Sequence, residues 1–236
     1  MYAAPALENP NAETSQRLWL YEGAAHFAQA VAQEKDGRSA ALDYLEGHRE
    51  ALLQAEKTGV QPEALVQPEV LKDATQEAFY HSKATLVWWM LRDMVGDAAL
   101  QRTLRRYRPA DDQDAAYFEH LIETESKRDL GWFFDDWVYQ DRGLPDFHVQ
   151  SVHPWKTEKS VQFITVTLEN LGNAGAEVPF TIFFEGGEIT KRIEVRATAT
   201  ATTRVELPGT ATKIVVNDGS VPEIDLTNNV FKISAP

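Results

Sequence analysis

The hydrophobic period of this chain changes once, at Gly143-Leu144-Pro145, and that change limits what the chain can fold into. Before this point apolar residues recur every three or four positions, which is typical of amphipathic helices. After it, Val, Ile, Phe and Thr alternate with polar residues in short runs, which is typical of strands. The sequence therefore predicts a helical part followed by a β-sheet part.

Six helices are expected in the first part, where start and stop residues separate the periodic segments. Their approximate ranges are 15–33, 39–59, 75–95, 97–107, 114–125 and 132–139. The third segment is apolar almost all round from Leu86 to Leu91. A helix of that kind lies inside a bundle rather than on its surface.

Six runs in the second part have the composition and alternation of strands: 161–168, 178–184, 189–195, 200–207, 213–216 and 230–233. Turn signals such as Gly186-Gly187 and Asp218-Gly219 separate them. Six or seven short strands at this spacing are typical of an immunoglobulin-like antiparallel β-sandwich. The expected fold class is α+β with two domains, a helical bundle over 1–145 and a β-sandwich over 146–236.

Charge and composition exclude several classes of partner. The formal net charge is −13 at pH 7, whereas nucleic acid and anionic membranes call for basic patches. No apolar run approaches the roughly 20 residues that cross a bilayer, so no membrane span is expected. The chain has no cysteine, so a metal site would have to use His, Asp or Glu.

Glu22 is the side chain that most needs a partner. It lies in the apolar helical stretch Trp19–Phe27, and an unpaired ionised carboxylate in such a setting is normally paired, protonated or bound to a metal. Gly23 follows it, although glycine inside a helix costs up to about 1 kcal/mol relative to alanine. That glycine predicts close packing against another backbone.

Two simple interpretations of Glu22 need no metal. The carboxylate would lie at the solvated edge of the helix and pair with Arg17 or Lys35, or it would pair with His26 on the same helical face four residues later. His26 also allows a third interpretation, in which it is a second metal ligand beside Glu22.

Three segments, in this order, resemble gluzincin zinc metallopeptidases, namely the M1 aminopeptidase group and its M61 relatives. Trp19–Phe27 is similar to the group's W-L-x-E-G-x-A-x-[YF] helix, and Tyr80–Asp97 to its Y-x-K-G-A helix with an M-L-R-x-x-x-G ending. Leu130–Phe147 resembles the end of the catalytic domain. Together the three segments cover most of residues 15–147.

The resemblance implies a zinc ion held by Glu22 and by two histidines of an H-E-x-x-H helix. No H-E-x-x-H occurs in this sequence. We therefore expect a C-terminal piece of a longer metallopeptidase that is inactive and binds no metal by itself. Its full-length form would bind zinc and hydrolyse peptide substrates together with an upstream H-E-x-x-H segment. The compartment is not defined, although a periplasmic or secreted location would suit such an enzyme.

The tyrosine of the second motif is offset by one position. Where the group has its tyrosine, two residues before Lys83, this chain has His81, and Tyr80 stands one residue earlier. Either side chain would then stabilise the oxyanion of the reaction. Tyr80 is favoured because a phenol donates a hydrogen bond without titrating near neutral pH. Lys83 is expected to pack within the helix bundle or to form an ion pair.

In a rival interpretation the chain has the fold of a peptidase but no catalytic activity. In it the chain is a non-catalytic, peptidase-like scaffold that acts as a binding or assembly module, because folds often persist where activity does not. The surface of the β-sandwich would then carry the function.

Overall fold

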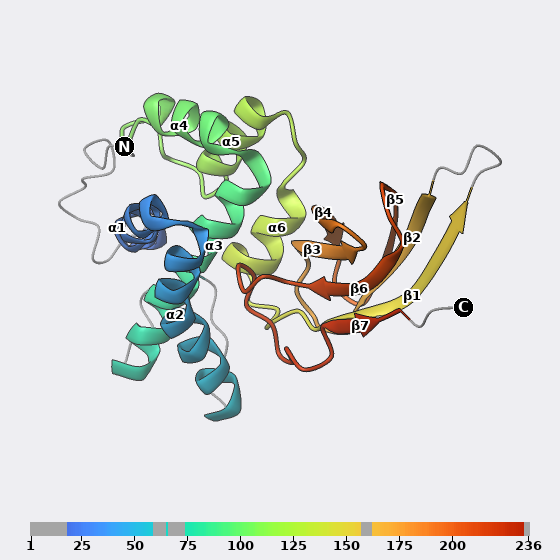
Figure 1. Ribbon diagram of the computed structural model, residues 1–236. Helices are drawn as coiled ribbons and strands as arrows, with labels where there is room; N and C mark the ends of the chain where they lie inside the picture. Colours follow the sequence, from blue (N-terminus) through green and yellow to red (C-terminus); the bar gives the residue numbers. More distant parts are fainter. Residues whose placement is uncertain (1–17, 59–64, 66–73, 157–161, 234–236) are drawn as a thin grey trace. The chain divides into compact units, whose positions relative to one another are not determined.

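The computed structural model describes residues 18–58, 65, 74–156 and 162–233 (Figure 1). The chain divides into two compact units, Met1–Gly143 and Leu144–Pro236. The first is helical and the second consists of antiparallel sheets, so the fold is α+β. The expected boundary between residues 145 and 146 lies close to the observed division. None of the helices in the described ranges is long and apolar enough to cross a membrane.

The helices begin and end close to the positions expected from the sequence. Their bounds are Leu18–Gln33 (α1), Arg38–Thr58 (α2), Ala74–Val95 (α3), Asp97–Arg106 (α4), Tyr117–Ser126 (α5) and Gly131–Phe134 (α6). A 3-10 helix, Glu34–Asp36 (η3), joins α1 to α2, and a π-helical turn, Asp135–Tyr139 (η5), continues α6. Residues 15–17 of the first expected helix lie outside the described part of the chain.

Helix α3 is the centre of the helical unit and contacts α1, α2 and α4 (Figure 1). Its Trp88 and Trp89 are completely buried, as the apolar segment predicted. The Trp88 ring stacks on Phe27 with 5.8 Å between centroids, and its indole N–H donates a 3.3 Å hydrogen bond to the Trp19 carbonyl. This contact fixes α1 against α3.

A charged side chain completes the same core. Arg92 is only 6 % exposed, and its guanidinium lies 4.0 Å from the centroid of the Trp89 ring. It pairs with Glu34 of η3 and with Asp93. Such partners offset the free-energy cost of burying the guanidinium charge.

The second unit contains seven strands in two antiparallel sheets. Their bounds are Phe147–Lys156 (β1), Gln162–Asn170 (β2), Ala176–Phe184 (β3), Gly187–Val195 (β4), Thr200–Leu207 (β5), Ala211–Val216 (β6) and Val230–Lys232 (β7). One sheet has the order β1-β2-β5 and the other β4-β3-β6-β7. Contacts of β1 with β6 and of β4 with β5 join the two sheets around the buried alternate positions.

The strand β1 was not among the six runs expected from the sequence. It pairs with β2 along its whole length, but the register shifts between Val149 and Ser151. A bulge of this kind changes which positions face the core. The alternation of buried and exposed residues therefore breaks in the middle of β1, and the sequence pattern does not predict this strand.

A buried carboxylate connects the loop after β6 to the start of β1. Glu223 is 2 % exposed and accepts hydrogen bonds from the side-chain amides of Asn217 and Asn229 and from the Phe147 backbone N–H. Burial raises the pKa of Glu223 to about 7, although the three donors act in the opposite direction.

The packing of Gly23 gives a first prediction. A Cβ on Gly23 would lie 2.5 Å from Trp88 Cδ1 and 2.8 Å from the Ala84 carbonyl oxygen. Gly23→Ala should therefore destabilise the protein, because overpacking typically costs about 1–3 kcal/mol and exceeds the gain in helix propensity. The measurement is the free energy of unfolding in urea.

Gly47→Ala in α2 is the matched control. A Cβ at Gly47 would meet nothing within 4 Å. The substitution should stabilise the helix by up to about 1 kcal/mol. Equal effects of the two substitutions would contradict the close contact between α1 and α3.

Glu223 gives a second prediction, on pH. Its folded pKa of about 7 lies above its ordinary value of 4.5, so the folded state binds the proton more tightly. Stability should then fall as pH rises from about 4.5 to 7, by up to about 3 kcal/mol. The measurement is the unfolding free energy of the native protein minus that of Glu223→Gln, which should decrease by up to about 3 kcal/mol over this window because only the native protein has the titrating group. A constant difference would contradict the raised pKa.

Candidate metal centre

Glu22 lies near the start of α1 and faces α3. The close approach at Gly23 brings the two helices together there. The Glu22 side chain keeps 38 % of its surface exposed, and its Oε2 atom lies 3.5 Å from Nδ1 of His81. The partner of Glu22 in the described residues is thus a histidine of α3, not Lys35; Arg17 lies outside those residues.

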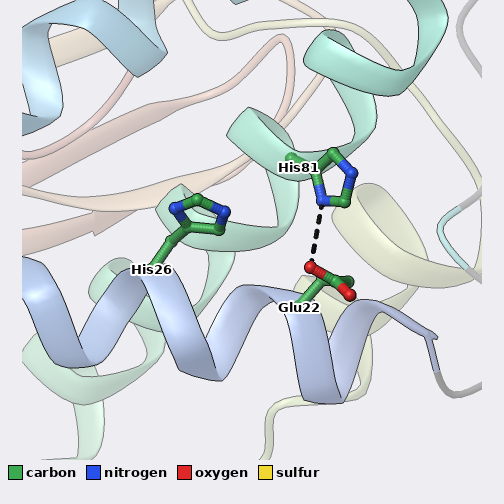
Figure 2. A group of neighbouring side chains, drawn as sticks. All are labelled: Glu22, His26 and His81. Carbon is green, nitrogen blue, oxygen red and sulfur yellow. Dashed lines mark ion pairs between the residues drawn. The ribbon is translucent and has the colours of Figure 1, made fainter.

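His26 completes a group of three potential ligands with Glu22 and His81 (Figure 2). It lies one turn after Glu22 on α1, and the three side chains are all half-buried. One donor atom from each residue lies within 4.8 Å of the other two. Figure 2 shows both residues of α1 directed toward the space beside His81. Two imidazoles and one carboxylate are a common ligand set for zinc in proteins.

A third histidine, His48 of α2, borders this group. Its ring lies 5.6 Å from the His26 ring, and its Nδ1 atom is 3.1 Å from Ser82 Oγ. Burial, together with the neighbouring His26 and His81, lowers the pKa of His48 to about 4. His48 is therefore neutral near pH 7 and adds no positive charge beside Glu22.

Tyr80 lies beside the group, but its hydroxyl is already engaged. It donates a 2.8 Å hydrogen bond to the Leu65 carbonyl and is within reach of the Trp19 backbone N–H. Burial raises the pKa of Tyr80, and the Glu22 carboxylate raises it further. The structure therefore brings His81 rather than Tyr80 into contact with Glu22. The sequence had favoured Tyr80 for the role of oxyanion donor.

Lys83 forms an ion pair, which is one of the two roles expected from the sequence. Its Nζ atom lies 2.8 Å from Asp141 Oδ2, and both side chains are almost completely buried. Desolvation lowers the pKa of Lys83, and Asp141 opposes that change. The pair ties α3 to the segment after η5.

The sequence placed Glu22 and His26 on one helical face and identified His81 separately, but it did not predict that His81 meets them. It missed His48 and Glu77, whose Oε1 atom lies 3.6 Å from His81 Nε2. Glu77 and His81 are four residues apart on one helix, and this spacing could have predicted the contact between them.

Comparison with known proteins does not assign the chain to a family. No protein-family model matches the sequence, and no match was found among curated proteins. Among solved structures, a CARDB domain from Pyrococcus furiosus, in complex with di-metal ions, is 16 % identical, with a TM-score of 0.32 over 37 % of this chain and 83 % of that one.

Two further structures have weaker similarity. A β-glucosidase, DesR from Streptomyces venezuelae, is 14 % identical, with a TM-score of 0.25 over 44 % of this chain and 18 % of its own. The alkylpurine DNA glycosylase AlkC of Pseudomonas fluorescens is also 14 % identical, with a TM-score of 0.25 over 98 % of this chain and 80 % of its own. Similarity at this level says nothing about the chemistry of this chain.

The hydroxyl of Tyr80 gives a third prediction. Tyr80→Phe removes the buried donor to the Leu65 carbonyl, so the protein should lose about 1–3 kcal/mol of stability. Tyr44→Phe is the control, because the Tyr44 hydroxyl bonds Gln29 in an exposed setting and should change stability by less than about 0.5 kcal/mol. Urea unfolding of both variants provides the measurement. A Tyr80→Phe protein as stable as the native one would leave the hydroxyl without a structural role.

Proposed function

We propose that the helical unit is the C-terminal part of the catalytic domain of a zinc metallopeptidase related to the M1 aminopeptidases. The observation that supports this proposal best is the contact between Glu22 and His81. The two residues belong to separate M1-like motifs. Glu22 stands at the position of the zinc ligand and His81 at the position of the tyrosine, and the fold brings them together. Glu22 is also accessible enough to bind an ion, with 38 % of its side chain exposed.

In this proposal Glu22 is one of three protein ligands, and the other two are histidines of an H-E-x-x-H segment outside this sequence. Bound zinc would acidify a water molecule and polarise the carbonyl of a peptide substrate. The residues of this chain would then hold the ion and position the peptide. By itself the chain would not hydrolyse peptides, because the general base belongs to the other segment.

His81 is better placed than Tyr80 to donate a hydrogen bond to the oxyanion. The Tyr80 hydroxyl is bonded to the backbone, whereas Nδ1 of His81 is buried without a hydrogen-bond partner in the described residues. A donor must be free to point at the oxygen on which charge develops. His81 would therefore take the role of the motif tyrosine.

The second unit would be the β-sandwich that follows such catalytic domains, with an immunoglobulin-like arrangement of its strands. Two antiparallel sheets of three and four strands support this assignment. In the same proposal the two compact units are separate domains, divided near Gly143.

One observation favours the rival function, a binding module without catalysis. The second unit has a pocket of about 400 Å³ that is bordered by Trp155 and Lys156 of β1, Phe163 of β2, Leu207 of β5 and Ala211 of β6. Small-molecule sites have volumes of roughly 300–1,000 Å³ and mostly apolar walls. A ligand of that size would fit this pocket.

The fourth prediction tests the peptidase proposal in a longer form of the protein that carries the H-E-x-x-H segment. Glu22→Gln keeps the size of the side chain but replaces the carboxylate, so zinc content and peptide hydrolysis should both be lost. The measurements are metal analysis of the purified protein and cleavage of a peptide library.

Glu50→Gln, an exposed acid of α2, is the control and should change neither quantity. Unchanged zinc content in the Glu22→Gln protein would overturn the ligand assignment. Zinc binding without any hydrolysis in the native protein would instead favour the rival binding module.

A further inference from the structure

Two imidazoles and a carboxylate from α1 and α3 meet at one place on the helical unit, and all three belong to this chain (Figure 2). We propose that Glu22, His26 and His81 bind one divalent transition-metal ion, of the zinc or cobalt type, without any ligand from outside the described residues. This inference goes beyond the proposed peptidase centre, and Glu22 is the only metal ligand that the two have in common. In the peptidase proposal His26 has no role and His81 is a hydrogen-bond donor.

The spacing of the donors suits an ion of this size. Ligand atoms about 2.0–2.1 Å from a tetrahedral zinc ion lie about 3.3 Å from one another. The Glu22 and His81 atoms are already 3.5 Å apart, and all three donor atoms lie within 4.8 Å of one another. Small side-chain rotations of half-buried residues would close the remaining distance. Glu22 and His26 are one helical turn apart, so the backbone holds both on the same face.

His81 has one nitrogen directed into the group and the other toward a supporting acid. Nδ1 is buried, has no hydrogen-bond partner among the described residues and faces the Glu22 carboxylate. Nε2 lies 3.6 Å from the carboxylate of Glu77. A metal-bound histidine commonly donates its second N–H to a carboxylate, which orients the ring and strengthens the ligand. His81 has this arrangement before any ion is bound.

His26 is supported in a comparable way. Its Nδ1 atom lies 3.5 Å from the Tyr44 hydroxyl, which donates its own proton to Gln29. The hydroxyl oxygen is therefore available to accept a hydrogen bond from Nδ1–H, and that tautomer leaves Nε2 of His26 with its lone pair free for the ion. The second histidine thus has a ring orientation set by a neighbour outside the ligand group.

The chemistry of the donors selects the class of ion. Nitrogen from imidazole favours zinc, cobalt, nickel or copper over magnesium and calcium, which prefer oxygen alone. Three protein ligands leave a fourth tetrahedral position for water or a substrate atom. Glu22 and His81 retain 38 % and 24 % of their side-chain surface exposed, so an ion can reach the site from solvent.

The fifth prediction uses the 236-residue chain, stripped of metal and titrated with Zn²⁺ in a calorimeter and with Co²⁺ by visible absorption. One equivalent of either ion should bind, and Co²⁺ should show the intense absorption of four-coordinate geometry. His26→Ala and Glu22→Gln should each weaken binding by more than about 100-fold, since even partners of a ligand contribute 10–100-fold. Glu77→Gln should weaken it by about 10-fold or more.

His153→Ala is the matched control, an exposed histidine of β1 in the other unit, and should bind like the native chain. Circular dichroism confirms that each variant is folded. His26→Ala and Glu77→Gln alter half-buried or exposed side chains, so at least one of them should yield folded protein. Native binding no tighter than that of the Glu22→Gln, His26→Ala double variant, or unaltered binding by His26→Ala, would overturn the proposal.

The two proposals fail in different ways. If the 236-residue chain binds no metal while the longer protein loses zinc only on Glu22→Gln and not on His26→Ala, the in-chain site is wrong and the peptidase centre stands. If the 236-residue chain binds metal through His26 and the longer protein has no Glu22-dependent hydrolysis, the in-chain site stands and the peptidase centre is wrong.

Discussion

The contact between α1 and α3 at Gly23 is the constraint on which the helical unit depends. A side chain at this position would overlap Trp88 and the Ala84 carbonyl, so only glycine lets the two backbones come so close. The indole N–H of Trp88 then reaches the Trp19 carbonyl. Glu22, the residue before the glycine, is thereby held against the first turns of α3. The position of the candidate metal centre follows from a packing requirement, not from attraction between its own charges.

The fold was largely predictable because hydrophobic periodicity reports burial directly. Helix α3 shows this most clearly, since its all-round apolar segment from Leu86 to Leu91 is buried. The strand β1 is different. Its bulge between Val149 and Ser151 changes the facing of the later residues, and a period-2 pattern cannot follow such a shift. The sequence pattern also did not predict that Glu223 is buried and hydrogen-bonded, because only the fold brings its three donors together.

The candidate site was predictable only in part, for a geometric reason. A carboxylate in an apolar helix identifies Glu22, but its partner belongs to a segment almost sixty positions later in the sequence. Adjacent residues on a helix point about 100° apart. Tyr80 and His81 therefore point in different directions, and the motif alone does not give the rotation of α3. That rotation is set by the packing of Trp88 against Phe27, which directs His81 toward Glu22.

Both proposed ligand sets contain Glu22. They are therefore alternative ways to bind one ion, not two sites that are occupied together. A tetrahedral zinc ion with one water has room for three protein ligands. If two of these are histidines of an H-E-x-x-H helix, His26 and His81 cannot also bind it, and His81 is left as a hydrogen-bond donor beside the ion. If they are His26 and His81, the chain needs no further segment to hold the metal. The ring support that Tyr44 gives His26 favours the second arrangement for this chain alone, because His26 has no role in the first.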